Sequence, residues 1–388
     1  MSASSIDLGG HALSGRREQW ATRAVFLVAG LAMAAWAPLV PFAKARVGVE
    51  DGALGLLLLC LGLGSIVAMP ITGVLASRFG CRAVIVVSTL ALAAVLPFLA
   101  LVDTVPALAV ALAVFGASVG TVDVAMNIQA VMVEKDSGRN MMSGFHGLFS
   151  LGGILGAGGV SLLLGLGGSP LAATLAVSAA LVVLLVFSFS GLLPYGNREA
   201  GVSPLFVLPR GIVIFIGLLC FLVFLGEGAV LDWSALFLID THGIDAARAG
   251  FGYTMFAIAM TAGRLCGDRI VKGLGGMKVV VGGGLVAALG FLLAVFAPMQ
   301  PLVFAGFLLV GVGASNIVPV LFTAAGQQTR MPASLAVAAI TTLGYAGILV
   351  GPALIGFVAQ QWNLGVGLVL VAAGLLFVAV SWPLTARR

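Results

Sequence analysis

Charged residues are scarce in this sequence: only 9% of the 388 residues are Asp, Glu, Lys or Arg, against roughly 25% in ordinary soluble domains. Because a folded soluble chain always leaves water-facing positions to fill, so little charge excludes a soluble globular protein. In place of charge, 61% of the residues are hydrophobic, and the mean hydropathy is +1.19. The 54 glycines agree, since small residues let membrane helices approach closely. The composition predicts an all-α membrane protein.

Cysteine pairs and catalytic motifs are also missing. The four cysteines, Cys60, Cys81, Cys220 and Cys266, contain no CxxC spacing, so we expect inert thiols rather than disulfides. The sequence has no HExxH, no GxGD and no phosphate-binding GxxxxGK[ST]. We therefore expect no enzymatic activity, no bound metal and no cofactor.

Helix-length apolar runs follow one another along nearly the whole chain, and each reaches the ~20 residues that cross a bilayer core. The longest connection, 194–210, is rich in proline, glycine and charge, which is typical of a linker. We expect six-helix bundles at 23–193 and 211–383 and short tails at 1–22 and 384–388. The twelve expected spans are 23–43, 53–76, 83–102, 106–133, 143–167, 170–193, 211–238, 248–271, 278–298, 301–326, 334–360 and 364–383.

Basic residues are unevenly distributed over the expected loops. With the N-terminus in the cytoplasm, 16 Lys and Arg fall on that side, and only Lys44, Arg46 and Arg248 fall on the other, which accounts for all 19. The positive-inside rule then places both termini in the cytoplasm. The first span is too long for a signal-peptide core, so we expect it to be retained. The excess of basic residues thus reflects membrane topology, and we expect no nucleic-acid partner. We expect a monomeric multi-pass protein of the inner membrane.

Three sequence patterns of the first half recur in the second at a shift of about 194 residues. Halves with an even number of helices share one orientation, and such parallel repeats rock about a site near the bilayer midplane. The repeat therefore predicts a transporter that works by alternating access. The patterns are Gly120-Thr121-Val122-Asp123 with Gly313-Ala314-Ser315-Asn316, Gly152 and Gly156 with Gly347 and Gly351, and Gly73 and Arg78 with Gly267 and Lys272.

Ionisable groups inside a membrane cost about 2.5–3.5 kcal/mol on insertion scales, so each is a candidate for function. Asp123 begins a polar stripe in the fourth span, with Asn127 one turn further on. Asn316 begins the corresponding stripe of the tenth span. If both stripes face one cavity, they would bind a hydroxyl-rich or amine-bearing solute. The alternative is that they join neighbouring helices within one half.

The seventh span carries two acids, Glu227 and Asp232. Gly226 and Gly228 flank Glu227, which predicts a bend or opening of the helix at this point. The two acids lie ~140° apart around the helix and would not serve one site together. Glu227 is a candidate for proton coupling, and Asp232 is a candidate substrate contact nearer the outer end.

Three further side chains have two interpretations each, and a fourth has one. His146, in the fifth span, suits a proton relay, and a hydrogen-bonded histidine between packed helices is the alternative. Trp36 and Tyr345 would form the aromatic wall of a sugar site, or they pack as ordinary core. Arg264 is interpreted as part of a latch near the inner face.

The segment between the second and third spans, Gly73-Val74-Leu75-Ala76-Ser77-Arg78-Phe79-Gly80-Cys81-Arg82, resembles the loop signature of the major facilitator superfamily. The resemblance covers essentially the whole chain and implies two parallel six-helix bundles. It also implies that Gly73, Arg78 and Arg82 take part in a gate that closes the inward side. The fifth position of the signature is usually acidic, and here it is Ser77. The second half offers its own gate candidates, Arg264, Asp268 and Arg269.

Asp123-Val124-Ala125-Met126-Asn127 resembles the acid-x-Ala-x-Asn segment of fucose-permease-like sugar:proton symporters. The resemblance implies a proton- and substrate-binding role for Asp123 and Asn127. Those symporters also carry an acid in the first helix, which is absent here and would be replaced by Glu227 or His146. Other strings, such as Gly144-Phe145-His146-Gly147, resemble the bacterial MosC/YbjJ-type branch of the superfamily.

Together these patterns predict a secondary active transporter that moves a small polar solute, sugar- or cyclitol-like, with protons. The alternative is a proton-driven exporter of drugs or other amphipathic or cationic compounds, because Gly152 and Gly156 are spaced as in the antiporter signature of the fifth helix. Ala157, however, stands where that signature has proline. A membrane sensor is a third class, which the short loops and the lack of a soluble domain disfavour.

Overall fold

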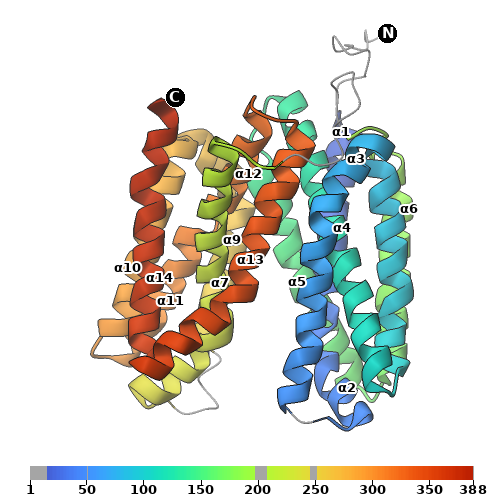
Figure 1. Cartoon of the computed structure of the whole chain (residues 1–388), viewed down its shortest axis with the longest axis horizontal. Helices are drawn as coiled ribbons and strands as arrows, with labels where there is room; N and C mark the ends of the chain where they lie inside the picture. The colour runs from blue at the N-terminus through green and yellow to red at the C-terminus, as the bar shows by residue number, and fades with distance from the viewer. Residues whose placement is uncertain (1–14, 50, 197–207, 245–250, 388) are drawn as a thin grey trace. The chain divides into compact units, whose positions relative to one another are not determined.

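The computed structural model describes residues 15–49, 51–196, 208–244 and 251–387, and helices are the regular secondary structure of these residues (Figure 1). The chain forms two compact units. Unit 1 comprises Met1–Met141, Leu148–Pro209 and Met331–Ala338, and unit 2 comprises Met142–Gly147, Arg210–Arg330 and Ala339–Arg388. Most of the expected linker lies outside the described residues. Arg248, in the expected eighth span, also lies outside them.

In unit 1, α3 and α4 pack against each other, α6 packs against α3 and α1, and α1 also contacts α4 (Figure 1). The first helix begins at Arg16, inside the expected polar tail, where the Glu18 carboxylate accepts the Gly15 N–H at 2.7 Å. The elements are α1 (Arg16–Ala35), η1 (Ala37–Leu39), α2 (Val40–Val47), α3 (Asp51–Leu101), α4 (Val105–Ser137), α5 (Met142–Gly165, of which unit 2 holds the first turns) and α6 (Pro170–Phe189).

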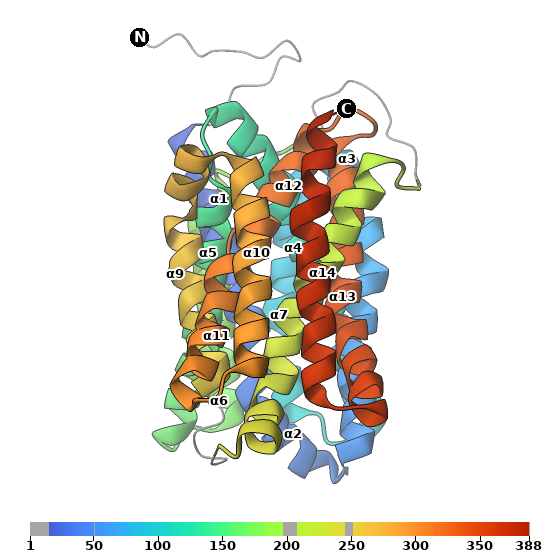
Figure 2. The ribbon, with the colours of Figure 1, turned by 90° about the vertical axis from the view of Figure 1, so that its left-hand side faces the viewer.

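In unit 2, α10 packs against α11 and α14, and α9 packs against α11 (Figure 2). The α7 helix contacts α14 and α9. The elements are α7 (Ile212–His242), α9 (Phe251–Leu274), α10 (Gly276–Phe296), α11 (Gln300–Ala314), α12 (Ile317–Gln327), α13 (Ala333–Gln361), α14 (Leu364–Ser381) and η2 (Trp382–Arg387).

Ten helical segments within the described residues are long and apolar enough to cross a membrane. One of them, Leu56–Leu101, has 46 residues and is interrupted at Gly80, whose φ of 83° and ψ of 157° are not helical. A β-carbon at Gly80 would collide with the Pro194 carbonyl, so the close turn requires glycine. The α9 helix, with 24 residues, is not among the ten.

Helix interruptions occur at other places than the sequence predicted. The expected opening of α7 at Gly226 and Gly228 is wrong, since α7 is continuous from Ile212 to His242. Instead, the expected tenth span is divided at Ser315–Asn316 into α11 and α12. The expected first span is divided at Trp36, and a short 3-10 turn follows; Pro38 supplies no N–H there, which favours a break.

Close helix contacts recur in the two units at the shift seen in the sequence. At each contact a glycine faces a backbone carbonyl so closely that a β-carbon would overlap it, which is how membrane helices exploit small residues. The contacts are Gly152 with Leu27 (α5 on α1) and Gly347 with Phe221 (α13 on α7), then Gly116 with Leu61 (α4 on α3) and Gly311 with Phe256 (α11 on α9). Each partner is displaced by 194 or 195 residues, so the two units share a packing plan.

Candidate functional site

In unit 1, a carboxylate and an amide lie together inside α4. Asp123 is 8% exposed and Asn127 is 1% exposed. The Asn127 amide nitrogen donates to the Asp123 backbone oxygen at 2.9 Å and approaches its carboxylate oxygen at 3.4 Å. These contacts follow from the four-residue spacing, which places one side chain a turn above the other.

The Asn127 amide oxygen is buried and has no hydrogen-bond partner among the described residues. Leaving such an acceptor empty costs about 1–3 kcal/mol, so a donor from water or from a bound solute is expected to fill it. Since the amide nitrogen is already committed to a backbone carbonyl, the orientation of the amide is fixed by its neighbours. The pair Asp123–Asn127 thus offers hydrogen-bond acceptors to a ligand.

Other polar groups of α4 hold the unit together. Gln129, which is fully buried, donates to the Thr22 hydroxyl at 3.0 Å and accepts the Leu193 N–H at 3.0 Å. Glu134 accepts the Met141 N–H at 2.6 Å and so supports the turn into α5. Gln129 was not among the predicted site residues, although an amide within an apolar span is a visible signal.

In unit 2, Glu227 of α7 and Arg264 of α9 form a buried ion pair. The guanidinium Nη2 lies 3.2 Å from one carboxylate oxygen and 3.4 Å from the other. The two side chains are 17% and 8% exposed. Arg264 therefore bonds an acid deep in the unit, a contact that its interpretation as a latch residue did not predict.

The break between α11 and α12 supplies another partner for Arg264. Pro319 has no N–H for the carbonyl four residues earlier, that of Ser315. The Ser315 carbonyl accepts instead from Arg264 Nε at 3.3 Å. The four-residue spacing of Ser315 and Pro319 is the sequence signal for this site, and it was not among the predicted features.

Asn316 lies at this break, packed against α9. Its amide nitrogen donates to the Gly263 carbonyl and to the Ser315 hydroxyl, both at 3.0 Å. Its amide oxygen is buried without a hydrogen-bond partner among the described residues. Gly263 and Gly267, one turn apart on α9, leave the space for Ser315 and Asn316, since β-carbons there would overlap their side chains. Unit 2 thus also contains a buried amide oxygen without a hydrogen-bond partner, and this oxygen is packed against Gly267.

His146, in the first turns of α5, belongs to the same unit and is buried. Its ring lies 5.6 Å from the Phe322 ring, tilted by 60°, and it interacts electrostatically with Arg264. Nearby in sequence, the Gly144 N–H donates to the Asp268 carboxylate at 3.0 Å. Unit 2 therefore holds a charged cluster, the Glu227–Arg264 ion pair, with His146 near Arg264.

The expected substrate contacts lie in different settings. The indole N–H of Trp36 is buried and has no hydrogen-bond partner in the described part of unit 1. The Tyr345 ring packs edge-on against Phe224, with centroids 6.2 Å apart. Asp232 is exposed on α7.

The expected gate residues also differ in their contacts. Gly73 is close to the first turn of α13, near Ala338. Arg82 donates to the Leu192 carbonyl at 2.9 Å and lies over the Phe189 ring at 5.3 Å. Arg78 and Arg269 are exposed.

Among the residues that the structure describes, no three His, Cys, Asp or Glu side chains gather as a metal site would require.

Comparison with known proteins identifies the family. Residues 24–352 match the Major Facilitator Superfamily. An uncharacterised MFS-type transporter of Yersinia pestis is 59% identical over 367 residues, covering 95% of both chains. Membrane protein MosC of Rhizobium meliloti is 29% identical over 359 residues, covering 92% of this chain and 87% of its own.

Among solved structures, the Escherichia coli fucose:proton symporter FucP aligns with a TM-score of 0.76 at 17% identity, covering 93% of this chain and 96% of its own. At that identity the likeness concerns the fold. The family resemblance noted in the sequence is confirmed. The chain belongs to the Major Facilitator Superfamily, a family of multi-pass membrane transporters rather than enzymes.

Proposed function

We propose that the protein is a proton-coupled secondary active transporter of a small polar solute, sugar- or cyclitol-like, in the inner membrane of a bacterium. The observation that carries the proposal is the buried Asp123 carboxyl group with the open Asn127 amide oxygen beside it. A buried carboxyl group can hold a proton in one state and release it in another, while the open oxygen accepts a hydrogen bond from a solute hydroxyl or ammonium group.

In unit 1, the buried Asn127 oxygen without a partner among the described residues favours a ligand rich in donors, as polyols and protonated amines are, over carboxylates and phosphates, which only accept. The Trp36 indole N–H, a buried donor, suits a hydroxyl group, which both donates and accepts. Polyols therefore fit these groups better than simple amines do.

We propose twelve membrane crossings with both termini in the cytoplasm. The 46-residue segment Leu56–Leu101 would be about 69 Å long as one helix, more than twice the ~30 Å hydrocarbon core, so its break at Gly80 divides it into two crossings. The 24-residue α9 is about 36 Å long and also reaches across. The distribution of Lys and Arg supports the orientation.

The Glu227–Arg264 pair is proposed as the second charged element of coupling, with His146 beside it. Protonation of Glu227 would remove one contact of Arg264, which also donates to the Ser315 carbonyl at the helix break. Proton binding at Glu227 would then act on the break between α11 and α12. The Glu227–Arg264 pair would take the place of the acid that fucose-permease-like symporters carry in their first helix.

The alternative, a drug exporter, rested on the glycines of the fifth span. Gly152 and Gly156 are both in close contact with the backbone of α1, at Leu27 and Leu31. Helix packing therefore accounts for their spacing, and nothing further in the described residues favours export.

The proposal is tested with purified protein in lipid vesicles. A thermal-shift panel of myo-inositol, L-fucose, D-xylose and simple amines first selects a solute, because a specific ligand stabilises the fold by mass action. We expect Asp123→Asn to abolish accumulation against a gradient, since the amide cannot carry a proton, while counterflow of the selected solute persists. The matched control is Asp103→Asn, at an exposed acid, which should accumulate solute normally. Accumulation by Asp123→Asn at the wild-type level would contradict the proposal.

A further inference from the structure

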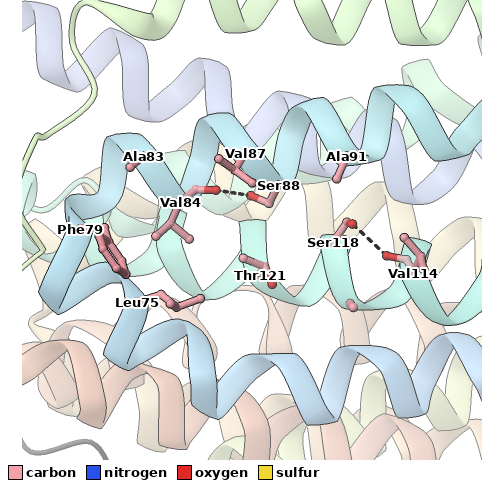
Figure 3. A pocket seen from close by; sticks show the side chains of 11 residues that line it. Leu75, Phe79, Ala83, Val84, Val87, Ser88, Ala91, Val114, Ser118 and Thr121 are labelled. Carbon is pink, nitrogen blue, oxygen red and sulfur yellow. Dashed lines mark hydrogen bonds between the residues drawn. The ribbon is translucent and has the colours of Figure 1, made fainter.

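An apolar groove runs along the outside of unit 1, between the two halves of α3 and α4 (Figure 3). Leu75 and Phe79 from the first half of α3 line one side, and Val84, Val87 and Ala91 line the other. The ribbon of α4 passes between them, with Val114, Ser118 and Thr121. The groove has a volume of about 590 Å³ and belongs to no part of the proposed transport site.

The surface of this groove is hydrocarbon in character. The hydroxyl groups of Ser88 and Ser118, drawn in Figure 3, donate within their own helices, at 2.6 Å to Val84 and 2.8 Å to Val114. They therefore present little polarity to an occupant. Phe79 and Val87 are 63% and 68% exposed, and such exposure of large apolar side chains on a membrane protein is expected to be covered by hydrocarbon.

The groove continues along the same two helices. A second apolar hollow of about 510 Å³ shares Val114 with the first and extends to Val102 and Pro106. From Ala83 to Val102 the helix rises about 28 Å, close to the ~30 Å of hydrocarbon in a bilayer. The lining is thus apolar over the depth that acyl chains occupy.

The length of the groove suits an extended hydrocarbon chain. From Ala83 to Ala91, α3 rises about 12 Å, and the second hollow continues the apolar lining towards Val102.

A free cation stands at the end of the groove near the α3 break. Arg78 directly precedes Phe79 and follows Leu75 by three residues, so it lies at the end of the face that those side chains form. It is exposed, and no hydrogen bond or ion pair of Arg78 occurs within the described chain. The preceding Ser77, where the superfamily signature usually has an acid, donates its hydroxyl to the Val74 carbonyl at 2.9 Å. The Arg82 guanidinium is held by the Leu192 carbonyl.

From this arrangement we propose that the groove binds one phospholipid with an anionic headgroup. Its acyl chain lies between Leu75, Val87 and Val114, and its phosphate pairs with Arg78. The lipid would bridge the two halves of α3 across the Gly80 break. The absence of an acid at position 77 leaves Arg78 available for this contact.

The test uses the full chain in detergent with dioleoyl phosphatidylglycerol that carries a photoreactive diazirine in mid-chain. After irradiation, we expect crosslinks concentrated on peptides that contain residues 83–91 and 114–121. The phosphatidylcholine analogue should label these peptides about fivefold less at equal subsaturating concentration, since one favourable lipid charge contact has roughly that effect. These two measurements need no variant.

Two variants test the headgroup contact and the acyl-chain contact separately, and each has a matched control. Arg78→Gln should reduce labelling by phosphatidylglycerol about fivefold, whereas Arg139→Gln, at another exposed arginine, should not. Ala91→Phe should fill the groove and remove the labelling, whereas Val183→Phe, on the exposed face of α6, should leave it intact. Unchanged elution and melting temperature serve as the check that each variant folds.

Three results would overturn the proposal. Labelling spread evenly over all exposed apolar helices would indicate ordinary bilayer contact. Equal labelling by the two lipids would exclude a preference for an anionic headgroup, and with it the proposal. Crosslinks from the groove to a second copy of the chain would identify a helix interface instead of a lipid site.

Discussion

At the scale of residues, the two buried acids Asp123 and Glu227 differ in what a proton would do to them. Asp123 has an amide as its neighbour, so protonation removes a charge and leaves no other behind. Glu227 is paired with Arg264, so its protonation removes a carboxylate charge from beside a guanidinium, which a low-dielectric interior disfavours. We therefore assign the primary proton-carrying role to Asp123 and a switching role to the pair.

The Glu227–Arg264 pair makes an asymmetric prediction about stability. Glu227→Gln should destabilise the protein severely, by about 3–5 kcal/mol, because a guanidinium cannot lose its proton. Arg264→Gln should be milder, since Glu227 can take up a proton and become neutral. Thermal unfolding of both variants in detergent measures the difference, and a double Gln variant should recover part of the loss. Equal destabilisation by the two single changes would argue against a buried ion pair.

At the scale of elements, glycines set where helices touch and a proline sets where one breaks. Gly152 and Gly347 bring α5 and α13 against the backbones of α1 and α7. Pro319 leaves the Ser315 carbonyl open to Arg264. Local backbone chemistry thus places the charged cluster of unit 2 at a helix interruption.

These contacts predict which glycines tolerate a methyl group. Gly152→Ala and Gly347→Ala should each destabilise the protein by about 1–3 kcal/mol, because overpacking forces the helices apart. Gly158→Ala is the matched control in α5, since nothing lies within 4 Å of its β-carbon position; it should be neutral or stabilise by up to about 1 kcal/mol. Melting temperatures in detergent distinguish these outcomes, and a Gly152→Ala protein as stable as the control would refute the packing assignment.

Much of this element plan was predictable from the sequence, because apolar length and glycine spacing are local signals. The recurrence of Gly152 as Gly347 was one of them, and both sit at equivalent helix contacts. The Glu227–Arg264 pair was not predictable, since it depends on which faces of α7 and α9 meet. The opening expected beside Glu227 does not occur, because glycine permits an interruption without requiring one, whereas Pro319 removes a hydrogen bond outright.

At the scale of the whole molecule, the two units share a packing plan and differ in chemistry. The contacts at Gly116 and Gly311 are equivalent, yet Asp123 in unit 1 corresponds to Asn316 in unit 2. Duplication accounts for the common framework. The difference in charge supports the proposal that unit 1 carries the proton and unit 2 holds the ion-pair switch.

The most direct test of this account is proton movement that a solute drives through Asp123. Vesicles that contain the purified protein and a trapped pH-sensitive dye are given the solute selected by the thermal-shift panel on the outside. No pH gradient or membrane potential is imposed. The account predicts that entry of solute acidifies the lumen with wild-type protein and with Asp103→Asn, and that Asp123→Asn gives no pH change while solute still equilibrates. Solute entry without proton movement in the wild type, or an undiminished pH change in Asp123→Asn, would contradict it.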